Sequence, residues 1–261
     1  MEEQARDQPR RARNSAKSCD AGMTARQNGN GQRTLPRLIV PRGPSRAAPA
    51  GSVRGPVVFV PLLDRLLFRH PFEGPSARRY ARDERPAFGD LDERLLDGLA
   101  LTGSEALLDL GCGPGTFARA ARARHPGLVV VAVDPSRDFA RPGVVRASGE
   151  ALPLADRSID VAICLSSIRH VRDRAQTLRE LRRVVRGRLV IVELDPAASR
   201  ARVHAHADRL GSRLLRRAFG PLVLRTAPPA EAIAALAREV GFAQRDLRAD
   251  PEQPVYIMEL A

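Results

Sequence analysis

The stretch Leu107-Leu108-Asp109-Leu110-Gly111-Cys112-Gly113-Pro114-Gly115-Thr116 decides the fold, because an apolar run passes through three closely spaced glycines into a helical pattern. Glycine has no Cβ, so the backbone can turn sharply at these positions and approach a ligand closely. The helix that we expect over 116–124 would point its free N–H groups toward that ligand. The segment therefore predicts a strand, a ligand-binding loop and a helix in immediate succession.

Two acidic residues accompany this loop. Asp109 lies near the end of the first apolar run, and Asp134 follows a second run at 129–133. A buried carboxylate costs free energy unless it accepts hydrogen bonds or meets a cation. An acid at the carboxyl end of a second strand can accept both hydroxyls of a ribose. The glycine spacing is G-x-G-x-G, and Thr116 stands where a dinucleotide-binding loop has its third glycine, so a nucleoside ligand is favoured over NAD.

Apolar runs and helical patterns alternate along the rest of the chain. The remaining expected strands lie at 144–147, 159–165, 188–192 and 255–260. Helices are expected at 57–68, 90–101, 171–185, 201–219 and 230–240. Such alternation, with strands that are apolar throughout, predicts an α/β fold with a doubly wound parallel sheet covered by helices on both faces.

The composition bounds the organisation of the chain. The 261 residues include 43 Lys and Arg and 30 Asp and Glu, for a net charge of +13. Residues 1–55 contribute +7 of this and predict a disordered, dispensable basic extension. We expect a helical cap over 56–102, a main domain over 103–261, and a helical insertion at 197–227. All but one of the basic residues are Arg, which indicates a coding bias more than phosphate binding, so a nucleic-acid partner is not favoured.

Neither a membrane span nor a secretory signal is visible in the sequence, so the chain is predicted to be cytoplasmic. Cys19, Cys112 and Cys164 are too few and too scattered for a disulfide framework or a metal cluster. His204 and Asp208 could meet on one helix face, but two ligands do not make a dedicated metal site. No metal is therefore expected.

With these motifs, residues 90–195 resemble the class I S-adenosylmethionine-dependent methyltransferases, in particular the type 11 methyltransferase domain. The resemblance implies a Rossmann-like, mostly parallel seven-stranded sheet whose last strand is antiparallel. It also implies S-adenosyl-L-methionine as methyl donor and S-adenosyl-L-homocysteine as product. The implied cofactor-binding residues are Asp109, Gly111, Cys112, Gly113, Gly115, Asp134, Pro135, Ser148, Gly149, Glu150 and Leu165.

In this resemblance Asp109 and the glycine loop hold the methionine part of the cofactor, and Asp134 the ribose hydroxyls. The loop at 149–154 meets adenine, and Leu165 and Ser166 lie by the methyl group. The chain departs from the family pattern at three places. Ser148 stands where Asp is frequent, Arg169-His170 replaces paired histidines, and the turn before the fifth strand is shortened to 186–188.

The acceptor is harder to infer. His170 is a candidate general base, and its alternative is a surface residue at a helix start. Residues 164–167 read Cys-Leu-Ser-Ser and lack the [Asn/Asp]-Pro-Pro-[Tyr/Phe] motif of base amino-group methyltransferases. We therefore expect a small-molecule acceptor, methylated at O, N or C by in-line displacement, with catalysis mainly by positioning. Its pocket is expected from 57–90 and 197–227, where Tyr80 is a lid residue or part of the core.

Two alternatives stay open. One is a methyltransferase of RNA or protein that uses the basic extension as an anchor, and the other is a non-catalytic protein that retains cofactor binding. The oligomeric state is not determined by the sequence.

Overall fold

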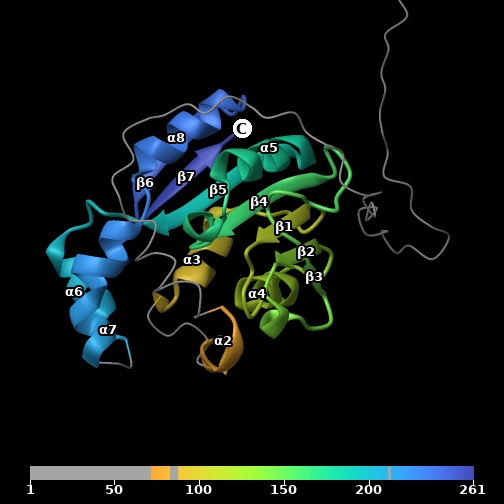
Figure 1. Ribbon diagram of the computed structural model, residues 1–261. Coiled ribbons are helices and arrows are strands. Elements are labelled where there is room, and N and C mark those ends of the chain that lie inside the picture. Colours follow the sequence, from red (N-terminus) through yellow and green to blue (C-terminus); the bar gives the residue numbers. More distant parts are fainter. Residues whose placement is uncertain (1–71, 83–87, 211–212) are drawn as a thin grey trace, which may run out of the picture. The chain divides into compact units, whose positions relative to one another are not determined.

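The sheet of the computed structural model has the order β3-β2-β1-β4-β5-β7-β6 (Figure 1). The structure describes residues 72–82, 88–210 and 213–261, all within one compact unit. The strands described there are β1 (Ala106–Leu110), β2 (Val129–Asp134), β3 (Val144–Arg146), β4 (Ile159–Leu165), β5 (Val185–Leu194), β6 (Gln244–Ala249) and β7 (Val255–Leu260). Strands β1 to β5 pair in parallel, whereas β7 pairs antiparallel with both β5 and β6. This confirms the predicted doubly wound sheet with an antiparallel last strand.

Helices lie on both faces of the sheet, as the alternation predicted. The described α-helices are α2 (Gly74–Arg82), α3 (Leu91–Gly98), α4 (Thr116–Arg124), α5 (Arg174–Val184), α6 (Arg200–Asp208), α7 (Arg213–Ala218) and α8 (Ala230–Glu239). Leu91 of α3 and Phe117 of α4 belong to one apolar cluster, and Leu178 of α5 and Ile233 of α8 belong to another. Successive side chains of a strand point to opposite faces, so β1, β4 and β5 contribute to both clusters and are buried from both sides.

The second half of the chain differs from the sequence expectation in three respects. Helix α5 passes directly into β5 at Val185, so residues 186–188 belong to the strand. A Cβ at Gly187 would lie 2.2 Å from the Asp160 carbonyl oxygen, so only glycine fits beside β4 there. The expected helix at 201–219 is divided into α6 and α7. Strand β6 was not predicted, because its six residues are all exposed and carry no apolar pattern.

Several sequence expectations lie outside the described residues, namely the disordered extension at 1–55 and the helix at 57–68. The boundaries 56–102, 103–261 and 197–227 remain predictions. Within the described ranges, every helix is too short or too polar to cross a lipid bilayer.

Candidate functional site

The glycine loop joins the carboxyl ends of three neighbouring strands. The N–H groups of Gly111 and Cys112 both donate to the Val133 carbonyl at the end of β2, at 2.8 and 3.1 Å. Gly111 has a φ of +73°, and a Cβ built on it would lie 2.4 Å from Cβ of Ser167, just beyond β4. Gly111 is therefore required both by its left-handed backbone and by the close approach of β4.

The end of the loop prepares the N-terminus of α4. Gly113 and Gly115 also have positive φ, and Gly115 is the N-cap of the helix. In contrast to Gly111, a Cβ at Gly113 would meet only Phe139 and Tyr80, at 3.8 Å. The backbone N–H groups of the first turn of a helix have no partner within the helix. This end of α4 can therefore donate hydrogen bonds to a ligand lying over β1.

Asp134 is held against this loop by backbone donors. Its Oδ2 accepts from Gly113 N–H at 2.9 Å, and its Oδ1 accepts from Ser136 N–H at 2.8 Å. Burial raises the pKa of Asp134 above its usual value, although the bonds from Ser136 and Gly113 act in the opposite direction. Among the described residues, no arginine forms an ion pair with it. A carboxylate has roughly four acceptor positions, so Asp134 can still accept hydroxyl donors.

Asp109 and Cys112 lie beneath the loop. The Asp109 side chain is 2% exposed, and the residue pairs in register with Ala132 of β2 and Ile163 of β4. Burial, and then the nearby carboxylates of Asp109 and Asp134, raise the pKa of the Cys112 thiol far above its usual value. A thiol held in its neutral form is a poor nucleophile, which fits a packing role for Cys112.

Two hydroxyl groups near the loop have no hydrogen-bond partner within the described part of the chain. They are Thr116 Oγ1, at the start of α4, and Ser166 Oγ, directly after β4. Ser166 also has a φ of +51°, a left-handed conformation that costs a non-glycine residue about 1–2 kcal/mol. Strained residues concentrate at functional sites. Ser166 was not among the expected cofactor-binding residues. Its backbone conformation, which marks it as a candidate, cannot be read from the sequence.

The segment after β3 provides mainly backbone. Gly149 is buried, and a Cβ there would lie 2.9 Å from Cγ2 of Thr177 on α5. The exposed Ser148 hydroxyl donates to Glu150, whose other oxygen accepts from the N–H groups of 172 and 173 at 2.8 and 3.1 Å. Pro135 is exposed after β2, and Leu165 is buried at the end of β4. The side chains of Ser148 and Glu150 are thus engaged with each other and with the segment before α5.

His170 is half-buried and lies beside Phe72, just before α2. Its ring centroid is 4.8 Å from that of Phe72, and Tyr80 and Phe139 extend the same aromatic cluster toward Gly113. Burial, and then the charges of Arg169 and Arg174, lower the pKa of His170 to about 3. The ring is therefore neutral at pH 7 and binds a proton weakly, which makes it a poor general base. The position of Tyr80 is compatible with both a lid and a core residue.

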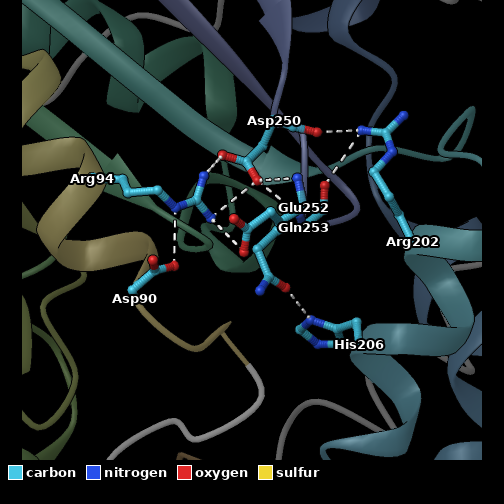
Figure 2. A network of polar contacts seen from close by, with 7 residues as sticks. All are labelled: Asp90, Arg94, Arg202, His206, Asp250, Glu252 and Gln253. Carbon is cyan, nitrogen blue, oxygen red and sulfur yellow. Dashed lines mark hydrogen bonds and ion pairs between the residues drawn. The ribbon is translucent and has the colours of Figure 1, made fainter.

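A separate polar network lies between α3, α6 and the loop that joins β6 to β7 (Figure 2). Asp250 is 3% exposed and accepts from Arg94 at 2.6 and 3.2 Å and from the N–H of Gln253 at 2.6 Å. Arg202 donates to the Asp250 carbonyl at 2.6 Å, and His206 Nδ1 lies 2.9 Å from Oε1 of Gln253. The network fastens the insertion to α3, at the border of the region expected to hold the acceptor.

Metal-binding residue types do not converge here. His204 and Asp208 are both exposed on α6, while His206 is buried between Phe88 and Phe219. Over residues 72–82, 88–210 and 213–261, His, Cys, Asp and Glu side chains form no group of three that could hold a metal ion.

Comparison with known proteins finds matches over the part of the chain that contains the glycine loop and Asp134. Residues 108–191 match the family model described as a methyltransferase domain. A transposon-encoded 37.1 kDa protein of Streptomyces fradiae is 41% identical over 115 residues, covering 39% of this chain and 33% of that protein. The ubiquinone/menaquinone biosynthesis C-methyltransferase UbiE of Syntrophotalea carbinolica is 37% identical over 111 residues, covering 37% of this chain and 47% of the relative.

An uncharacterized methyltransferase of Mycobacterium ulcerans is 37% identical over 138 residues, covering 47% of this chain and 52% of the relative. The chain thus spans between a third and about half of the length of these relatives. Two solved methyltransferase structures share the fold. One, from Methanococcus maripaludis, covers 73% of this chain and 93% of its own at a TM-score of 0.58 and 16% identity. The other, from Aquifex aeolicus, covers 70% of this chain and 97% of its own, at a TM-score of 0.55 and 13% identity.

Proposed function

We propose that this chain, whose residues 108–191 match a methyltransferase domain, transfers a methyl group from S-adenosylmethionine to a small-molecule acceptor. The observation that carries the proposal is Asp134. It is a buried carboxylate with free acceptor positions, fixed by the Gly113 N–H beside a helix N-terminus. Strand order reverses at β1 and β4, and ligands of open α/β sheets bind at such a reversal.

The donor set fits the parts of S-adenosylmethionine. Asp134 would accept from the two ribose hydroxyls, since hydroxyl donors are what a carboxylate already bonded to two N–H groups still lacks. Asp109, Gly111, Cys112, Gly113 and Gly115 would hold the methionine part. Thr116 supports this assignment, because its buried hydroxyl has no partner among the described residues. Pro135, Ser148, Gly149, Glu150 and Leu165 would border the nucleoside, with 148–150 contributing backbone groups.

The bound cofactor would supply an electrophilic methyl group that needs no activation by the protein. The residues of the chain would then hold the acceptor in line with that group and exclude water. Ser166 is the residue best suited to touch the reacting groups, because its strained backbone and unsatisfied hydroxyl lie at the end of β4. The low pKa of His170 supports positioning over base catalysis.

The acceptor side supports a small molecule. The aromatic cluster of Phe72, Tyr80, Phe139 and His170 borders the glycine loop at Gly113 and would give the acceptor an apolar surface of flat rings. One relative is named a ubiquinone/menaquinone C-methyltransferase. Quinones and phenols therefore head the panel of candidate acceptors.

Calorimetric titration of the full chain tests the cofactor site first. We expect dissociation constants on the order of 1–100 µM for S-adenosylmethionine and S-adenosylhomocysteine, and no heat with NAD. No binding of either compound, or a preference for NAD, would overturn the proposal. Transfer of labelled methyl from S-adenosylmethionine is then measured to quinones and phenols, total RNA and protein. Label in RNA, lost when residues 1–55 are deleted and weakened steeply by salt, would replace the small-molecule acceptor by RNA.

A further inference from the structure

Strand β6 forms one border of the sheet and pairs with β7 alone among the described strands (Figure 1). All six of its residues are exposed. Leu247, at its centre, is the large apolar side chain of the described residues that is most open to solvent, at 38%. A border strand presents unpaired backbone N–H and C=O groups and is a template for pairing with another strand.

The backbone N–H and C=O groups of Leu247 point away from β7, toward the open side of the sheet. Asp250 N–H donates to the Val255 carbonyl of β7 at 2.9 Å. Backbone groups alternate between the two sides of an antiparallel strand, so Arg248 and Asp246 also turn theirs toward β7. Leu247 and Ala249 then turn their N–H and C=O groups outward. The pairing with β7 is regular over 246–249, because the irregularity of β6 lies between Gln244 and Asp246.

The charges on either side of Leu247 have opposite signs, so an antiparallel copy of the strand would place each charge opposite its complement. Asp246 and Arg248 lie on one face of the strand, are about half exposed and form an ion pair with each other. In an antiparallel pair centred on Leu247, Asp246 of each copy would lie opposite Arg248 of the other, and the two Leu247 residues would face each other. Opposite charges on directly facing residues stabilise strand pairs, and like charges destabilise them.

We propose that β6 is the interface of a homodimer, in which the strands of two copies pair antiparallel about Leu247 and extend the sheet across a twofold axis. Charges on a border strand usually disfavour pairing with another strand. Here they disfavour pairing with unrelated strands but allow pairing with a second copy of β6. A second copy of this chain presents Arg248 to Asp246, whereas an unrelated strand does not. Such an interface is isologous, with the same surface used by both copies. It is also small, so we expect a dissociation constant on the order of 10–100 µM.

Charge reversal on β6 of the full chain tests the interface. Sedimentation equilibrium between about 10 µM and about 1 mM should show a monomer–dimer equilibrium for the unchanged protein. Asp246→Arg and Arg248→Asp should each be monomeric, because each places like charges opposite each other. An equimolar mixture of the two variants should form a heterodimer, since one strand is then positive at both positions and the other negative. Arg146→Asp, on the opposite border strand β3, is the matched control and should dimerise normally.

Circular dichroism of each variant establishes that it is folded. A monomeric unchanged protein up to the highest concentration would overturn the proposal. So would a dimer that survives both reversals, since its interface would then lie elsewhere. A mixture of folded variants that stays monomeric, while the single variants have lost the dimer, would also contradict the predicted pairing of Asp246 with Arg248. None of these results depends on whether the protein binds S-adenosylmethionine.

Discussion

Asp134 and Asp250 are both buried aspartates at the carboxyl edge of the sheet, yet their surroundings differ in kind. Asp134 is the last residue of β2, and among the described residues its side chain accepts only from the N–H groups of Gly113 and Ser136; burial raises its pKa. Asp250 follows β6 and meets the guanidinium of Arg94. Burial alone would raise the pKa of Asp250, but Arg94 and the N–H groups of Gln253 and Glu252 lower it.

The difference fits the proposed roles of the two residues, a ligand-binding group for Asp134 and a structural group for Asp250. Asp250 is fully compensated, so its charge stabilises the folded state. Asp134 remains short of compensation in the free protein, which is the condition expected of a carboxylate that awaits a ligand. We therefore assign different roles to these two acids on the basis of their partners. Three predictions test this assignment.

Asp250→Ala should give the largest effect, a loss of about 3 kcal/mol in the free energy of unfolding. The substitution leaves the buried N–H of Gln253 and the partly buried N–H of Glu252 without their acceptor and removes the partner of Arg94. For a domain of this size the midpoint of thermal unfolding should fall by about 8 °C, measured by calorimetry. Affinity for S-adenosylmethionine should change less than about twofold, because the network lies apart from the glycine loop.

Arg94→Met is the matched control for this change. The Arg94 side chain is 27% exposed, and Asp250 keeps its two backbone donors when the arginine is removed. The loss should therefore be smaller, about 1–2 kcal/mol, and the double variant should be less destabilised than the sum of the two. Additive losses would show that the two residues act independently and would remove Asp250 from the structural class.

The same pair shows what the sequence could predict. The glycine loop is followed directly by helix α4 and strand β2, which ends at Asp134, so the position of Asp134 relative to the loop follows from local pattern. The partners Arg94 and Asp250 are 156 residues apart, and β6, which brings Asp250 into place, has no apolar pattern. Ser166 was placed near the methyl group only by resemblance, because neither its φ of +51° nor its unsatisfied hydroxyl is visible in sequence. Local spacing therefore predicted the arrangement of the glycine loop and Asp134, whereas the contact between Arg94 and Asp250 depends on long-range packing.

Asp134→Asn should have the second largest effect, and on binding rather than on stability. The amide keeps the size of the side chain but loses the charge that strengthens hydrogen bonds from ligand hydroxyls. We expect affinity for S-adenosylmethionine to fall about 30-fold, which corresponds to about 2 kcal/mol, with unfolding changed by less than about 1 kcal/mol. Titration calorimetry beside urea unfolding measures both. A large loss of stability with intact binding would exchange the roles of Asp134 and Asp250.

The smallest effect is a difference in the pH dependence of the two aspartates. The folded pKa of Asp250 lies below its unfolded value, so its stabilisation is present above the unfolded pKa and disappears as the pH falls through the folded one. The folded pKa of Asp134 is raised, so the folded state takes up a proton first and gains stability as the pH falls toward the unfolded pKa. Urea unfolding between about pH 3 and pH 7 should therefore show the advantage of the unchanged protein over Asp250→Ala shrinking in acid. Its advantage over Asp134→Asn should grow over the same range, because the amide cannot take up a proton. Two parallel trends would mean that the partners of these carboxylates do not set their charge, and that the contrast between them is one of position alone.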